Sequence, residues 1–169
     1  ALSYEPEDVD VSYKVTIKSE ATSINLNYVI KTGDTALLRN LFNHSLIDDD
    51  KSTELADAFV DLVDHDDLNS LNLAENEWYR SKGFGNRPFN RSFQSLDEVR
   101  LVKGFIEVED SAPDWKEWFT LNSEGAIDIH GGTPELLSVV AETDLAIAEQ
   151  FVLEVRGGDG IVGTTDDRR

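Results

Sequence analysis

A run of acidic residues between Asp61 and Gly83 could bind a cation. The candidate ligands are Asp61, Asp64, Asp66, Asp67 and Glu75. Ca²⁺ takes about six to eight oxygen ligands from carboxylates, carbonyls and waters. Like charges this close repel, and negative charge is unfavourable at a helix C-terminus, so a bound cation would relieve both costs. We therefore expect calcium here, with a solvated acidic loop as the alternative; the spacing is not that of an EF-hand.

A second group of candidate metal ligands lies in the Gly- and Asp-rich tail "RGGDGIVGTTDDRR", at Asp159, Asp166 and Asp167. The three histidines are scattered at spacings that do not suit zinc. No nucleophile motif, phosphate-binding loop or dinucleotide fingerprint occurs, so we expect no catalytic and no organic-cofactor residues. Paired carboxylates can serve acid–base chemistry, which leaves a metal-dependent hydrolase open as an alternative.

The composition limits the partners. The 169 residues include 34 acids and 15 Lys or Arg, giving a net charge of −19. Such a surface repels nucleic acid and anionic lipid. The absence of Cys excludes disulfides and thiolate metal sites. The chain has no Met and no apolar run of the ~18 residues that span a bilayer, so we expect it to be part of a longer, processed protein.

Short strands and several helices must position these acids. Residues 9–17 alternate apolar and polar side chains, which predicts a half-buried strand paired with residues 24–26. Residues 119–121 and 126–129 predict another strand pair. The chain is thus predicted to be α+β, with a small antiparallel sheet.

Apolar spacing and capping residues predict five helices. Leu37, Leu38, Leu41 and Phe42 share one face, as do Leu55, Ala58, Phe59, Leu62 and Val63. A capping box, Ser95 to Glu98, predicts a helix that ends at Gly104. Thr133 with Pro134, and then Asp144, mark the starts of two further helices, which would form a hairpin. The hairpin's turn has two acids and no glycine, which argues against DNA binding.

Two parts of the chain share an order of features. Val15–Asn27 is similar to Phe119–His130, and each is followed by a helix with a Leu-Leu pair and a helix with a Phe-Val pair. This order predicts a duplicated strand–helical-hairpin unit.

Across residues 10–167, three motifs in sequence resemble the K-type minor pseudopilins of bacterial type II secretion systems. Asp61, Asp64 and Asp66 match the acids of D-W-x-D-x-D, and Ala74, Glu75 and Tyr79 match G-A-E-x-x-Y with one extra residue. The third motif, S-x-x-E-L-R-x-V-x-G, is matched by Ser95, Glu98, Arg100, Val102 and Gly104. Leu62 and Leu73 replace the family's Trp and Gly, and neither change removes an oxygen ligand.

The resemblance implies a non-enzymatic subunit with a pilin-like sheet and a large helical insertion. It assigns residues 1–30 and 116–130 to the sheet, residues 31–115 to the insertion, and residues 131–169 to a second helical hairpin and tail. It further implies capping of the pseudopilus tip together with I- and J-type minor pseudopilins, possible contact with secreted cargo, and possible Ca²⁺. An N-terminal helix absent from this sequence would hold the protein in the bacterial inner membrane, with the rest in the periplasm. A calcium-stabilised extracellular binding module remains the other alternative.

Overall fold

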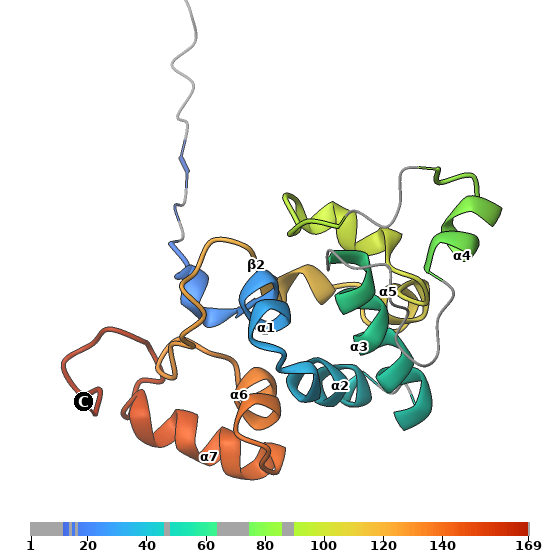
Figure 1. The fold of residues 1–169 in the computed structure, drawn as a ribbon. Coiled ribbons are helices and arrows are strands. Elements are labelled where there is room, and N and C mark those ends of the chain that lie inside the picture. Colours follow the sequence, from blue (N-terminus) through green and yellow to red (C-terminus); the bar gives the residue numbers. More distant parts are fainter. Residues whose placement is uncertain are drawn as a thin grey trace, which may run out of the picture.

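The computed structural model describes residues 12–13, 15, 17–45, 48–63, 75–85 and 90–168. Seven α-helices, three 3₁₀ helices (η) and two short strands occur in these ranges (Figure 1). In chain order they are η1 (Glu20–Thr22), β1 (Ile24–Asn25), α1 (Leu26–Thr32), α2 (Thr35–His44), α3 (Asp49–Val63), α4 (Glu75–Ser81), η2 (Leu96–Leu101), α5 (Ile106–Ser111), η3 (Trp115–Glu117), β2 (Phe119–Thr120), α6 (Pro134–Val140) and α7 (Leu145–Val155). The chain is α+β and mostly helical.

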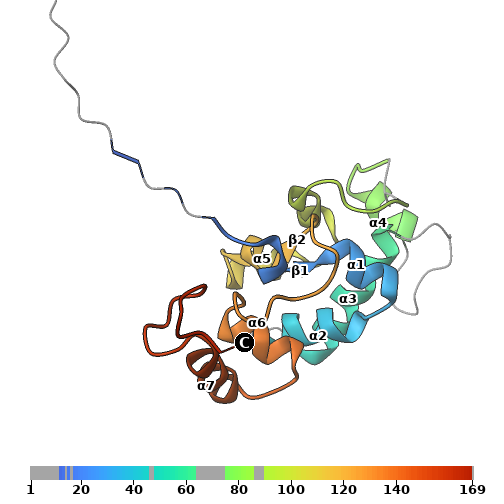
Figure 2. The same cartoon turned by 90° about the vertical axis from the view of Figure 1, so that its left-hand side faces the viewer.

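The sheet in the described residues is parallel, so the prediction of an antiparallel sheet is wrong. Ile24 pairs with Phe119 and Asn25 with Thr120. All of α1 to α5 therefore lies in the crossover between the two paired strands, and Figure 2 shows β1 and β2 side by side, with α1 to α4 to the right of them and α5 to the left.

Hydrogen bonds explain why the strand predicted at residues 24–26 ends early and why residues 126–129 are outside any strand. Asn25 ends β1 after two residues, because its carboxamide oxygen accepts from the backbone N–H of Tyr28 (3.0 Å) and caps α1. Its amide group also donates to the carbonyl of Ser123. This bond ties the turn after β2 to the start of α1. Residues 126–129 then form no strand, and the N–H of Asp128 donates to Ala21 O at 2.7 Å.

The predicted first strand is also not observed where the structure describes it. Ser12, Tyr13, Val15 and Ile17 are outside any strand and exposed, while Val9 and Val11 lie outside the described residues. The duplicated unit is accordingly not confirmed, because its first strand has no counterpart to the buried residues Phe119 and Thr120.

The predicted helical faces are confirmed in α2 and α3. Leu38, Leu41 and Phe42 of α2 are buried against α3 and its neighbours, with Leu55, Ala58, Phe59 and Leu62 facing them. Gly33 has φ +74° and turns the chain from α1 toward α2, a backbone conformation that glycine adopts without strain.

Aromatic residues from distant parts of the chain join the helices to the sheet. The ring of Phe59 stacks on Phe42, with centroids 5.4 Å apart, and meets Phe105 edge-on at 5.8 Å. Phe93 and Phe119 lie 6.0 and 6.3 Å away. The same buried cluster includes Trp115, and also Leu136 and Val139 of α6. One hydrophobic core therefore connects the sheet, the helices between its strands and α6.

The predicted capping box opens a 3₁₀ helix rather than an α-helix. The Ser95 hydroxyl accepts from Asp97 N–H at 3.2 Å. Glu98 accepts from Gln94 N–H at 2.9 Å and forms a two-point ion pair with Arg91 at 2.8 and 3.2 Å. The Arg91 guanidinium, with these backbone amides, lowers the pKa of Glu98 below its ordinary value.

We expect Glu98→Ala to lower the free energy of unfolding by about 1 kcal/mol at neutral pH, because the bonds to Arg91 and Gln94 are lost. A carboxylate with a lowered pKa stabilises the fold above its ordinary pKa of 4.5, and this contribution disappears as the pH falls through the folded-state value. The difference between wild type and variant, measured by urea unfolding, should therefore vanish in acid. A difference that is the same at every pH, or one equally large for the exposed Glu124→Ala, would contradict this assignment.

The second hairpin begins as predicted. The Thr133 hydroxyl caps α6 by accepting from Leu136 N–H at 3.2 Å, with Pro134 as the first helical residue. Asp144 occupies the N-cap position of α7 without a side-chain hydrogen bond. Arg156 donates to the carbonyls of His130 (3.0 Å) and Gly132 (2.7 Å), which fixes the end of α7 against the loop before α6. None of the helices in the described ranges has the length and apolar character that crossing a membrane requires.

Candidate functional site

The first acidic cluster starts at the end of α3. Asp61 lies on this helix and is only 3% exposed. Asp64, Asp66 and Asp67 lie outside the described residues. Glu75 is the first residue of α4, but its side chain is also outside what the structure describes. Whether these five acids converge therefore stays a prediction.

The structure adds Asp57 to this cluster. Asp57 is partly buried and precedes Asp61 by one helical turn. Burial raises the pKa of Asp57, and the nearby charge of Asp61 raises it further. Sequence reasoning missed this residue, although the i, i+4 spacing between the two acids was available to find it. Two carboxylates placed this way repel each other unless a cation lies close to both.

We expect Asp57→Asn to stabilise the protein in the presence of a chelator by about 0.5 kcal/mol, because the substitution removes the repulsion with Asp61. The raised pKa of Asp57 determines how its effect on stability changes with pH. An acid with a raised folded-state pKa favours folding at low pH, and this gain is lost as the pH rises through that pKa. The stabilisation should therefore be present at neutral pH and absent in acid. Thermal unfolding measures it, with the exposed Asp50→Asn as the matched control on α3; a destabilised Asp57→Asn protein would show that the carboxylate has a favourable partner.

The three acids of the tail come together around one hydroxyl. Thr164 Oγ1 lies 2.7 Å from a carboxylate oxygen of Asp166, 3.2 Å from Asp167 and 3.4 Å from Asp159. The same carboxylates accept from backbone amides of Gly158, Gly163 and Ile161 at 2.6–2.8 Å. These bonds, led by that from Thr164, lower the pKa of Asp166. The tail acids thus stabilise a loop by hydrogen bonds in this conformation.

Metal binding by the first cluster stays a prediction, because Asp61 is the one predicted member of it whose side chain the structure describes. No group of three His, Asp or Glu side chains in the described part of the chain is placed to hold a metal ion. In the tail, the oxygens of Asp159, Asp166 and Asp167 point toward Thr164 and the backbone amides rather than toward a common empty point.

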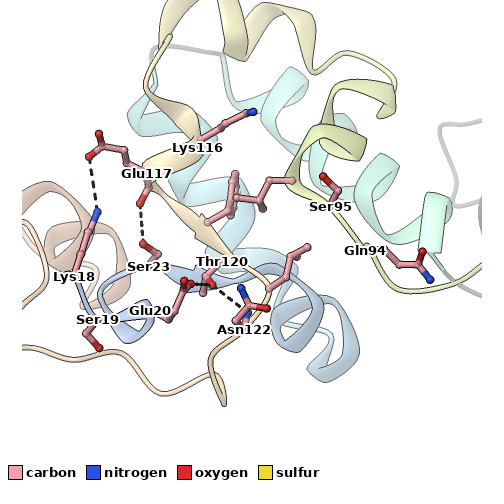
Figure 3. Close-up of a pocket in the computed structure, with 13 residues that line it drawn as sticks. Lys18, Ser19, Glu20, Ser23, Gln94, Ser95, Lys116, Glu117, Thr120 and Asn122 are labelled. Carbon is pink, nitrogen blue, oxygen red and sulfur yellow. Dashed lines mark hydrogen bonds and ion pairs between the residues drawn. The ribbon is translucent and has the colours of Figure 1, made fainter. Parts of the chain in front are cut away.

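A polar groove lies beside β2 (Figure 3). Its volume is about 600 Å³, and η1, β2 and the start of η2 contribute to its walls. The residues that line it are Lys18, Ser19, Glu20, Ser23, Gln94, Ser95, Leu96, Lys116, Glu117, Phe119, Thr120, Leu121 and Asn122. The groove was not predicted as a site, although Ser19, Glu20 and Thr120 lie within the two similar segments.

Hydrogen bonds within the groove hold its walls together. The Ser23 hydroxyl donates to Glu117 O at 2.9 Å, and the Thr120 hydroxyl donates to the Glu20 carboxylate. Lys18 Nζ lies 3.8 Å from Glu117 Oε2. Cations and anions are balanced here, and the polar groups already bond to each other. These contacts give the groove a structural role, because they join η1 and its neighbouring residues to β2 and η3.

Comparison with models of protein families identifies the family of the chain. A search of curated proteins finds no relative of this chain. A family model described as type II secretion system (T2SS), protein K, matches residues 22–108, which is just over half of the chain. The matched region runs from the end of η1 into α5, so it contains β1, the helices of the crossover and the first acidic cluster. The chain belongs to the protein K family of the type II secretion system.

Proposed function

We propose that the chain is the periplasmic part of a minor pseudopilin that caps the tip of the type II secretion pseudopilus. Membership of the protein K family gives it a structural role in secretion, in a pseudopilus with other pseudopilins. The observation that carries the proposal of capping is the crossover of residues 26–118, which places five α-helices between two adjacent strands.

The crossover is packed on the sheet and is part of the same core. Phe59 of α3 contacts Phe119 of β2, and Val99 and Phe105 are buried in the same cluster. A group of helices joined to the sheet in this way is a rigid body, because moving it would expose shared core residues. We infer that it occupies the space that a further subunit would need above this one, which ends the filament.

The proposal includes partners and location. The I- and J-type minor pseudopilins are the proposed neighbours, with secreted cargo as a possible transient partner. An N-terminal helix outside this sequence is the proposed anchor in the inner membrane. The net charge of −19 argues against nucleic acid as a partner.

The location of the protein on isolated pseudopili tests the capping proposal. These 169 residues contain no Cys, so a single exposed substitution such as Glu124→Cys gives the full-length protein one label site once any Cys outside them is replaced by Ser. Replacement of the wild-type gene by the labelled variant should preserve secretion, and electron microscopy should place the label at one end of each filament. Label along the filament length would overturn capping, and secretion that persists after deletion of the gene would overturn the role in secretion.

We also propose that the first acidic cluster binds Ca²⁺, through Asp61 with Asp64, Asp66, Asp67 and Glu75. The supporting observation is the repulsive pair Asp57–Asp61, at the point where the acidic stretch begins. The tail acids are the second candidate site. The hydrolase alternative has no comparable support among the described residues, because the groove of Figure 3 contains balanced, internally bonded side chains.

A further inference from the structure

Helix α7 has more apolar surface than its neighbours in the described chain cover. Ala148 and Val152 pack against Leu137 of α6. Outside this face α7 still exposes Leu145, Ile147, Phe151 and Leu153, with Ile147 at 55% and Leu153 at 68%. Helical geometry places Ile147 and Leu153 on opposite flanks. A helix that is apolar around most of its circumference is normally covered by other protein.

The helical hairpin that carries this exposed face is acidic. Residues 134–155 contain five acids and no Lys, Arg or His: Glu135, Glu142, Asp144, Glu149 and Glu154. The nearest bases along the chain toward the C-terminus, Arg156 and Arg168, are engaged internally. Arg156 donates to two backbone carbonyls, and Arg168 pairs with Glu154. The hairpin α6–α7 thus combines an apolar face with a negative surround.

This combination selects among possible partners. A second copy would bring the same acids and a net charge of −19, so the two surfaces would repel each other. A partner that fits brings apolar side chains to the centre and Lys or Arg to the rim. Ile147 and Phe151 lie at i and i+4, which forms a ridge suited to packing against another helix.

We infer that the exposed face of α7 docks a basic amphipathic helix of another pseudopilus subunit. The inference rests on the proposed function, and it assigns that function an interface and a partner chemistry. The apolar ridge supplies the buried contact, and the acidic surround selects the basic partner and orients it.

A single fluorescent label tests the interface. These 169 residues contain no Cys. With any Cys outside them replaced by Ser, Ile147→Cys in the full-length protein takes an environment-sensitive dye at one position, and Ile106→Cys of α5, at 62% exposure, is the matched control. The probes are the purified periplasmic domains of the other minor pseudopilins of the same secretion system, added one at a time. We expect one of them to shift the emission of the label at 147 to the blue, with no shift at 106. Binding should weaken by about tenfold or more at high salt, because the rim charges are screened.

Two variants measure the contributions of the apolar ridge and of the acidic residues to binding separately. Ile147→Glu and Glu149→Lys should each weaken binding by about tenfold or more, while Ile106→Glu should leave it unchanged. The circular dichroism and unfolding midpoint of each variant should match wild type. Equal binding by all variants would overturn the inference.

Light scattering on the same mixtures distinguishes failure of the α7 interface from failure of the proposed function. If complexes form but the emission of the label at 147 does not shift, the α7 interface is overturned and the proposed function is not. Absence of any complex would overturn the proposed neighbours as well. A blue shift that appears without an added subunit would also overturn the inference: one that grows with protein concentration would identify a second copy as the occupant, and one independent of concentration would identify the protein's own chain.

Discussion

Replacing Phe59 by Ala should lower the free energy of unfolding by about 3–5 kcal/mol. Phe59 is completely buried, and its ring contacts aromatic rings from α2, β2 and two segments between them. Removal of the ring leaves a cavity that the surrounding rings cannot fill, because each of them is held by its own element. Since a domain is stable by only about 5–15 kcal/mol, this loss is a large part of the total.

Chemical denaturation with the intrinsic tryptophan fluorescence as the signal measures this loss. Trp115 is in the same buried cluster, so it reports on the core directly. Phe84→Ala is the matched control, because Phe84 is 41% exposed, and it should cost less than about 1 kcal/mol. Similar losses in both variants would show that Phe59 does not join the helices to the sheet.

Calcium should raise the free energy of unfolding by about 2.7 kcal/mol once its concentration is roughly a hundred times its dissociation constant. The reason is that a cation favours the folded chain only where folding brings the carboxylates together. Asp57 and Asp61 lie one helical turn apart on α3, and relief of their repulsion by the ion would lower the dissociation constant. Thermal unfolding with Ca²⁺ and with chelator measures the shift.

Substitutions locate the ion. Asp64→Asn and Asp66→Asn should abolish the calcium shift, whereas the exposed Asp50→Asn on α3 should retain it. A shift that survives both and is lost in Asp166→Asn would place the ion in the tail. No shift in wild type at millimolar Ca²⁺ would remove the calcium proposal, and an equal shift with Mg²⁺ would indicate general screening of the acidic surface.

The spacing of apolar residues predicted α2 and α3 correctly, because burial of one apolar face determines where such helices form. The faces of α2 and α3 follow from the spacing of Leu, Ala and Phe, and the start of α6 follows from Thr133 and Pro134. Each of these signals is local. The motif order likewise predicted the family, which the match over residues 22–108 confirms.

The strands could not be predicted as well, because two-residue strands leave almost no alternation to detect. In "INLN" the apolar alternation suggested a strand through Leu26, but Asn25 is an N-cap and Leu26 is the first residue of α1. The direction of β2 relative to β1 depends on contacts across the whole crossover, which no short pattern contains. For the candidate site, spacing along α3 could have identified Asp57, whereas its burial depends on tertiary packing.

The pairing of β1 with β2 also sets an order of events during folding. Ile24 and Phe119 meet only after the intervening chain has closed a loop of more than ninety residues. The entropy of that closure must be recovered from contacts made within the loop. The helices of the crossover are local in sequence and should form early, and the two strands should meet last. We therefore expect formation of the sheet to be the slow step of folding, completed only in molecules whose crossover has already folded.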